Sequence, residues 1–166
     1  FDLDVSLEWD ASTDTQFLSQ LRFDFERASQ ILFDVTDGQV ALGHVRVYPA
    51  QGALADADVR IFASNAMRPY ASLGGVVVTP TVESIAGRML TYTPGQVILG
   101  ANWNRYGDPG TTVGEDYARA LAHELAHWML FQDDDYLGLD AANRLKQVST
   151  RTGTFMAEAY LDVNSE

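Results

Sequence analysis

The chain has 166 residues, of which 46% are hydrophobic and 11% aromatic, and its formal net charge is −12. This length and composition predict a single globular domain that is large enough to bury one core. A strongly acidic surface repels phosphate backbones and anionic lipids, so we expect neither a nucleic-acid partner nor a membrane partner. No apolar run approaches the length of a membrane span, which argues against membrane insertion.

Cysteine is absent, which excludes a disulfide framework and a thiolate metal site. The chain begins at Phe1, without an initiator methionine or a signal-like segment. We therefore expect a mature or excised portion of a longer protein. Clustered carboxylates among the 23 acidic residues could hold calcium, but the sequence gives no support for this beyond the charge itself.

The first two predicted elements are a half-buried strand over 3–9 and the helix that follows it. Hydrophobic and polar residues alternate along 3–9, which is the period of a strand. Thr13 or Asp14 can cap the helix, and Asp37-Gly38 ends it. The apolar residues of this helix recur at helical spacing and predict its buried face: Phe17, Leu18, Leu21, Phe25, Ala28, Ile31 and Leu32.

Two further strands are predicted over 39–48 and 57–63. Their expected core residues are Val45, Val47, Val59 and Ile61. Residues 64–94 have a less regular pattern, and we interpret them as a long surface excursion with a short strand starting at Gly74.

A strand over 95–103 and a second long helix come next. Thr112-x-x-Glu115 is a capping box that predicts the start of this helix, which should continue to about Phe131. Its expected interior residues are Tyr117, Leu121, Leu125 and Trp128. A short helix is predicted over 140–148. This order of elements predicts an α+β fold in which helices pack on a mixed sheet.

The second long helix carries the motif His123-Glu124-x-x-His127. On an α-helix, residues four apart lie about 40° from each other around the axis and about 6 Å along it. The two imidazoles can therefore converge on one zinc ion, and Glu124 lies beside them, where a metal-bound water would be.

A catalytic zinc needs three protein ligands and an open position for water. The third histidine, His44, falls in a predicted strand without a ligand partner nearby, so we expect it to be structural. Asp133, Asp134 and Asp135 follow His127 within two turns, and a carboxylate oxygen is an acceptable zinc ligand. We therefore expect one of these carboxylates to complete the site.

With these residues the chain resembles the zincin metalloproteases, and more narrowly the metzincins. Metzincins share a backing helix, a twisted sheet whose edge strand precedes the motif helix, a third ligand soon after the second histidine, and a methionine turn below the metal. The resemblance makes 95–103 the edge strand, where a peptide could add by main-chain hydrogen bonds, and makes Met156 the methionine of the turn. It also divides the single domain 1–166 into an upper subdomain over about 1–127 and a short lower subdomain over about 128–166.

The closest pattern is H-E-x-x-H-x-x-x-G-x-x-D-E-Y, which is found in calcium-activated chloride channel regulator proteins and similar bacterial domains. Five positions match it without gaps: His123, Glu124, His127, Asp134 and, at the last position, Tyr136. Phe131 replaces the glycine of the pattern, and Asp135 replaces its glutamate. The alignment favours Asp134 as the third ligand, with Asp133 as the runner-up.

These observations together predict a zinc-dependent endopeptidase with one catalytic zinc ion and a protein or peptide substrate. Glu124 would accept a proton from water and pass it to the leaving amine. Tyr136 and Tyr160 are candidate hydrogen-bond donors to the transition state, with packing as their alternative role. Proteins of the resembled type are often parts of larger secreted chains, and some cleave themselves, which implies a secreted or cell-surface, bacterial-type location. The oligomeric state stays open.

Two alternatives remain at this point. A peptidase of the gluzincin kind would take Glu158 as its third ligand, but this would leave Met156 and the aspartate cluster unexplained. The other alternative is a non-catalytic or self-processing metal-binding module of a larger surface protein. The intact Glu124 argues against an inactive enzyme, because loss of this residue is the simplest way to lose activity.

Overall fold

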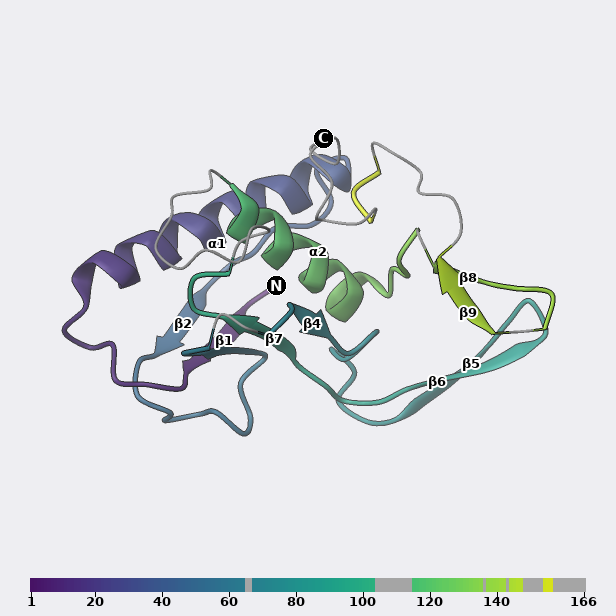
Figure 1. Cartoon of the computed structure of the whole chain (residues 1–166), viewed down its shortest axis with the longest axis horizontal. Helices are drawn as coiled ribbons and strands as arrows, with labels where there is room; N and C mark the ends of the chain where they lie inside the picture. Colours follow the sequence, from purple (N-terminus) through teal and green to yellow (C-terminus); the bar gives the residue numbers. More distant parts are fainter. Residues whose placement is uncertain (65–66, 104–114, 136, 143, 148–153, 157–166) are drawn as a thin grey trace.

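A computed structural model of the chain describes residues 1–64, 67–103, 115–135, 137–142, 144–147 and 154–156. The elements in chain order are β1 (Leu3–Leu7), α1 (Thr15–Val35), β2 (Val45–Tyr48), β3 (Val59–Phe62), β4 (Tyr70–Ala71), β5 (Thr81–Ile85), β6 (Arg88–Tyr92), β7 (Val97–Gly100), α2 (Asp116–Leu130), β8 (Leu137–Leu139) and β9 (Leu145–Gln147). Both helices lie on the same side of the main sheet (Figure 1). The predicted α+β class with a mixed sheet is therefore confirmed.

The main sheet has five strands in the order β2-β1-β3-β7-β4. Its first four strands are parallel, and β4 is antiparallel to β7. Val5 is paired with Val59, and Val59 with Val97, so that three fully buried valines form one row across the sheet. The strand predicted over 95–103 is therefore an inner strand, and the edge on this side is β4. The prediction that 95–103 forms the edge of the sheet was wrong, because β4, a strand of only two residues, pairs with the outer side of β7.

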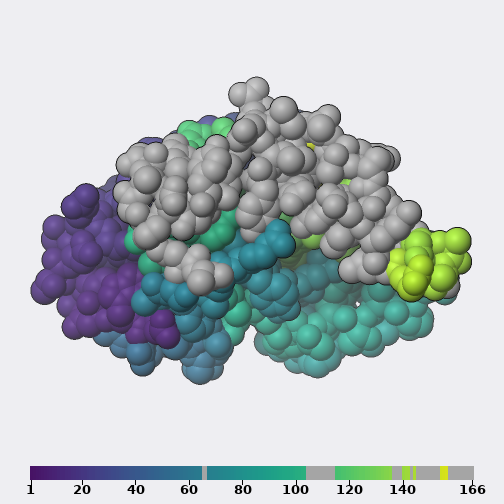
Figure 2. Space-filling model, viewed as in Figure 1, coloured from purple at the N-terminus to yellow at the C-terminus, as the bar shows by residue number. Residues whose placement is uncertain are grey.

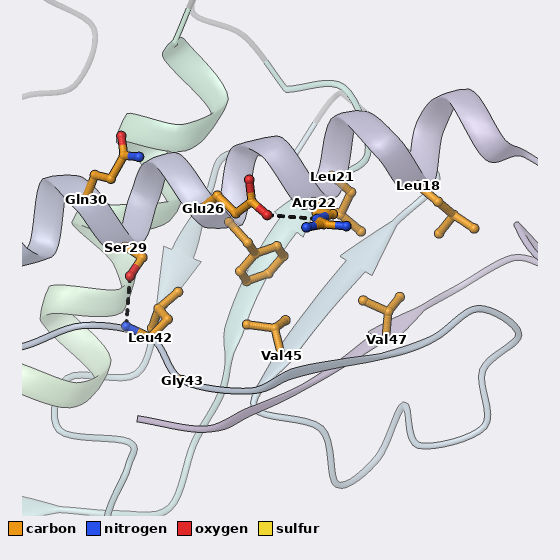
Figure 3. Close-up of a pocket in the computed structure, with 11 residues that line it drawn as sticks. Leu18, Leu21, Arg22, Glu26, Ser29, Gln30, Leu42, Gly43, Val45 and Val47 are labelled. Carbon is orange, nitrogen blue, oxygen red and sulfur yellow. Dashed lines mark hydrogen bonds and ion pairs between the residues drawn. The ribbon is translucent and has the colours of Figure 1, made fainter.

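The opposite edge of the sheet explains why two predicted core residues differ from the other two. Val59 and Ile61 of β3 are fully buried, as predicted, whereas Val45 is half-buried and Val47 is 38% exposed. β2 is the edge strand, and α1 does not cover it completely. A groove of about 590 Å³ remains between them, which Val45 and Val47 line together with Leu18 (Figure 3).

Helix α1 begins and ends where the sequence predicts. The Asp14 side chain accepts a hydrogen bond from the Phe17 backbone N–H at 2.9 Å, which is an N-cap interaction. After Val35 the chain turns through Asp37 and Gly38, both with positive φ (51° and 81°). Of the seven residues predicted for its buried face, four are buried, Leu21, Phe25, Ala28 and Leu32. The other three, Phe17, Leu18 and Ile31, are partly buried against the same core.

Residues 67–94 contain more regular structure than the sequence suggests. No strand starts at Gly74, which lies in a turn with φ 62°. Instead, β5 and β6 form an antiparallel hairpin around Ala86-Gly87, whose positive φ values of 50° and 76° suit a tight hairpin turn. We call this hairpin, Thr81–Tyr92, the arm. It extends away from the sheet and helices and forms a separate teal lobe in the space-filling view (Figure 2).

The predicted start of α2 and the short helix predicted over 140–148 were both wrong. α2 begins at Asp116, and Glu115 makes no side-chain cap; instead its carboxylate accepts hydrogen bonds from Arg27 of α1 at 2.8 and 3.0 Å. The other half of the predicted capping box, Thr112, lies outside the described residues. The helix predicted over 140–148 is replaced by the β8–β9 hairpin. Asp140 Oδ1 accepts from the backbone N–H groups of residues 142 and 144, and such local bonds compete with helix formation.

Among the described residues, no helix has both the length and the apolar character that a bilayer crossing requires.

Candidate metal centre

The motif lies in α2, most of whose residues are buried. Leu121, Leu125 and Trp128 point into the core with exposed fractions of 4% or less. His123 and Glu124 are also buried, at 6% and 8% exposed, although they are polar. Burial of a polar or charged side chain costs free energy unless it has partners. These residues therefore require an explanation that core packing alone does not give.

Three side-chain atoms from the motif and the loop after it converge on one point. Asp134 Oδ1 lies 3.2 Å from His123 Nε2 and 3.2 Å from His127 Nε2, and the two nitrogens are 3.1 Å apart. Tetrahedral zinc with ligand distances of about 2.0–2.2 Å holds its ligand atoms roughly 3.3 Å from one another. The three atoms thus already have the separation that one zinc ion would require, and among the described residues they form the group suited to a metal.

The other nitrogen of each imidazole faces a backbone carbonyl. His123 Nδ1 donates to Phe155 O at 3.3 Å, and His127 Nδ1 donates to Gln132 O. Because a carbonyl oxygen can only accept, these bonds keep a proton on each Nδ1, so that a neutral imidazole has its lone pair on Nε2. The Nε2 atoms are the ones that lie close to Asp134 Oδ1.

Asp134 Oδ1 is buried, and the Nε2 atoms of His123 and His127 lie 3.2 Å from it. Three such atoms at about 3 Å need positive charge between them, which either a metal ion or a proton on an imidazole can supply. Burial raises the pKa of Asp134, but the two imidazoles outweigh it and hold the pKa well below its usual range. The carboxylate is therefore ionised and available as a ligand.

A positive charge is favoured on the His127 imidazole. Burial lowers the pKa of this imidazole, but the Asp134 carboxylate and the Gln132 carbonyl outweigh the burial, so that the net pKa is raised. A proton on His127 can thus take the place of a metal ion as the positive charge beside Asp134. Metal binding would displace that proton.

Glu124 lies beside this group as the helix spacing predicts. Burial raises the pKa of its carboxyl, against smaller effects of His123 and His127 that lower it. The charge of Arg68, an exposed residue just before β4, also acts on Glu124 and lowers its pKa. Sequence reasoning missed Arg68, because its proximity depends on β4 pairing with β7 next to α2.

The loop that carries Asp134 begins with a backbone conformation that normally favours glycine. Phe131 ends α2 with φ 58° and ψ 30°, at the position where the resembled pattern has Gly. A non-glycine residue in this region is strained by roughly 1–2 kcal/mol. The Phe131 ring packs edge-on against Tyr92 with centroids 4.8 Å apart, and it contacts Gly74, where a Cβ would lie only 2.5 Å from the ring. These contacts offset the strain, and the bend persists without glycine.

Two backbone hydrogen bonds attach the turn at residues 73–76 to the end of α2. The Gly74 N–H donates to His127 O at 2.8 Å, and the Val76 N–H donates to Trp128 O at 3.2 Å. These bonds satisfy carbonyls that have no partner within the helix. On the other side, the Asp135 N–H donates to Met156 O at 3.1 Å, which attaches the ligand loop to the turn at 154–156.

The structure thus brings together some predicted site residues and leaves others apart. His123, His127 and Asp134 meet, whereas Asp133 is exposed and outside the group. The His44 side chain is 92% exposed and lies near Asp2, away from the motif. Met156 is 6% exposed and belongs to the core. The remaining predicted residues, Tyr136, Glu158 and Tyr160, lie outside the described residues.

The backbone carbonyls of Gln132 and Phe155 were not predicted. A carbonyl group leaves no signal in the residue type, so only the three-dimensional structure could have identified them.

The sequence matches no protein-family model, and a comparison with curated proteins finds none that is significantly similar. The functional assignment below therefore rests on the residues and their geometry.

Proposed function

We propose that the protein is a zinc-dependent endopeptidase of metzincin type, in which His123, His127 and Asp134 hold the metal and Glu124 is the general base. One observation carries the proposal: three possible ligand atoms, two imidazole nitrogens and one carboxylate oxygen, converge at 3.1–3.2 Å while both Nδ1 atoms are engaged by backbone carbonyls. A structural zinc site usually has four protein ligands, whereas three ligands beside a carboxylate are typical of a hydrolytic site.

A zinc ion bound there would supply a Lewis acid and lower the pKa of a water molecule towards neutrality. Glu124 would accept the proton of that water and later donate it to the nitrogen of the leaving amine. Because burial raises the pKa of Glu124, its carboxyl can both accept and release a proton nearer to neutral pH than an exposed glutamate can. His123 and His127 keep their orientation through the Nδ1 bonds while this proton moves.

Features outside the ligand group also support the metzincin type. β4 is an antiparallel edge strand close to α2 in the described structure, so we propose β4, in place of 95–103, as the strand along which a peptide substrate pairs. For Met156 we propose the role of the methionine in the turn below the metal, supported by its burial and by the bond from Asp135 to its carbonyl. By the same resemblance we propose a secreted or cell-surface location.

The test combines bound metal with hydrolysis. Wild type, Glu124→Gln, Asp134→Asn and Asp133→Asn are loaded with zinc, and the zinc content and the cleavage of casein are measured for each. Asp133→Asn is the matched control, because it removes the same charge from the neighbouring, exposed residue. We expect about one zinc per chain in wild type, Glu124→Gln and Asp133→Asn, with a loss of affinity of at least about tenfold in Asp134→Asn.

Cleavage should be retained in Asp133→Asn and reduced at least about a hundredfold in Glu124→Gln. Full activity of Glu124→Gln would refute the assigned base. Zinc binding without cleavage in wild type would identify a metal-binding module in place of an enzyme. Loss of zinc from Asp133→Asn and not from Asp134→Asn would move the third ligand by one residue.

A further inference from the structure

The arm exposes an unusual amount of apolar surface for an element of its size. Twelve large hydrophobic side chains are exposed among the described residues, and seven of them lie in or near the arm. These seven are on β4, between residue 78 and the end of the arm, and at the end of α2. Four belong to the arm itself: Val82, Ile85, Met89 and Leu90, with exposed fractions from 38% to 67%. An isolated two-stranded hairpin is only marginally stable in water, so selection for stability alone does not explain these residues.

The register of the arm divides its side chains between two faces. Cross-strand partners lie on the same face, and successive residues alternate between faces. One face, here called the inner face, carries the pairs Thr81–Tyr92, Glu83–Leu90 and Ile85–Arg88. The opposite, outer face carries Val82–Thr91 and Ser84–Met89.

The inner face is continuous with the surroundings of the metal centre. Tyr92, at its base, is buried against the ring of Phe131, the residue that ends α2 only four positions after His127. Leu90 and Ile85 continue from Tyr92 towards the tip of the arm. At about 3.3 Å per residue, the inner face extends roughly 13 Å outwards from Tyr92. Phe131 itself is 37% exposed and connects the two regions.

We propose that the inner face of the arm binds an extended, apolar segment of the polypeptide substrate, outside the residues that are cleaved. This inference rests on the proposed hydrolase function, because it identifies the ligand of the arm with the chain that reaches the metal centre. A segment of about four residues would span the inner face, with its side chains against Leu90 and Ile85.

The charges favour a substrate over a second copy of this chain. Each copy carries a net charge of −12, so two copies repel at long range. Pairing of β5 with its own symmetry mate about its centre would also place Glu83 opposite Glu83, and like charges directly opposite each other destabilise a sheet. The inner face itself contains one acidic and one basic residue, Glu83 and Arg88, and presents no net charge to a neutral substrate segment.

The experiment compares the two faces of the arm. The inner-face variant is Ile85→Thr with Leu90→Thr, and the matched control is Val82→Thr with Met89→Thr on the outer face of the same hairpin. All four original side chains are exposed, and threonine retains the strand preference, so both variants are expected to fold. The zinc-loaded proteins are assayed with casein and with a short fluorogenic peptide, and zinc content and sedimentation mass are measured for each.

We expect the inner-face variant to raise KM for casein about tenfold, because two aliphatic contacts are lost, while hydrolysis of the short peptide changes by less than about twofold. The outer-face variant should behave as wild type with both substrates. Equal effects of the two variants, or no effect of the inner-face variant on casein, would overturn the inference. A change of sedimentation mass in the inner-face variant would do the same, since it would identify a contact between copies.

Binding separates this inference from the proposed function. Casein binding is measured by fluorescence anisotropy with Glu124→Gln, alone and combined with the inner-face changes. If no protein cleaves either substrate, the proposed function fails. The arm is then judged by binding alone: weaker casein binding with the inner-face changes supports it, and unchanged binding refutes it.

Discussion

Replacement of Asp24 by asparagine should stabilise the protein at neutral pH and not at acid pH. Asp24 lies on α1, only 5% exposed, and its carboxylate accepts a hydrogen bond from Gln20 at 3.1 Å. Burial raises the pKa of Asp24 to about 6, and the bond from Gln20 lowers it only in part. Asparagine has nearly the same shape and keeps an oxygen for Gln20, so the change removes the charge and little else.

The sign follows from comparing the folded and unfolded proteins. An unfolded chain has an aspartate pKa of about 3.9, so the folded protein binds the Asp24 proton more tightly. The free energy of unfolding therefore falls as pH rises from about 4 to about 6, and stays lowered above that. The difference of about 2 pKa units corresponds to at most about 3 kcal/mol at pH 7. We expect Asp24→Asn to recover about 1–3 kcal/mol at pH 7 and less than about 0.5 kcal/mol at pH 4.

The assay is urea denaturation of wild type and variant at pH 4, 5, 6 and 7, with metal-free protein throughout. Asp34→Asn is the matched control, since it removes the same charge from an exposed position of the same helix and should change stability by less than about 0.5 kcal/mol. A gain from Asp24→Asn that is equal at pH 4 and pH 7 would show that packing, and not the buried charge, is responsible. A loss at pH 7 would show that the Asp24 carboxylate has a stabilising partner.

Three further changes test other parts of the structure. Zinc at a thousandfold excess over its dissociation constant should add about 4 kcal/mol to the free energy of unfolding. Calorimetry with and without chelator would measure this gain. An unchanged unfolding temperature would exclude a zinc site that forms only in the folded state. Gly75→Ala should lower the free energy of unfolding by about 1–3 kcal/mol, because a Cβ would lie 2.6 Å from the Trp128 ring. Gly87→Ala should lower it by only about 1 kcal/mol, because a Cβ there would meet no atom within 4 Å and only the φ of 76° is unfavourable. Equal losses in urea denaturation would refute the steric argument. A double-mutant cycle of Arg27→Met and Glu115→Gln should give a coupling of about 0.5–1 kcal/mol that decreases at high salt, and a coupling that salt leaves unchanged would argue against an ion pair.

The parts of the fold that were predicted correctly depend on residues close together in the sequence. The α1 boundaries follow from Asp14 and Asp37-Gly38, whose effects act within one turn. The convergence of His123 and His127 follows from helix geometry alone. For these features the local sequence contains the complete physical cause.

The features that were missed depend on partners that are distant in the sequence. Glu115 does not cap α2, because Arg27, 88 residues earlier, takes its carboxylate. β4 has only two residues and exists through its pairing with β7. Phe131 adopts a glycine-like conformation because Tyr92 and Gly74 provide contacts for its ring. The choice between Asp133 and Asp134 depends on the direction of the chain after this bend, which no spacing rule specifies.

The turn at 154–156 has a consequence for the order in which the protein can be assembled. His123, His127 and Asp134 have all been synthesised by residue 134, but the carbonyl that orients His123 belongs to Phe155, and the one that holds Asp135 belongs to Met156. A nascent chain that ends before this turn contains all three proposed ligand side chains and the Gln132 carbonyl that faces His127, but not the carbonyls that orient His123 and hold Asp135. If the proposed zinc site is correct, tight zinc uptake should therefore mark a chain whose synthesis has passed residue 156, and proteolytic loss of the turn should weaken zinc binding while leaving the motif intact.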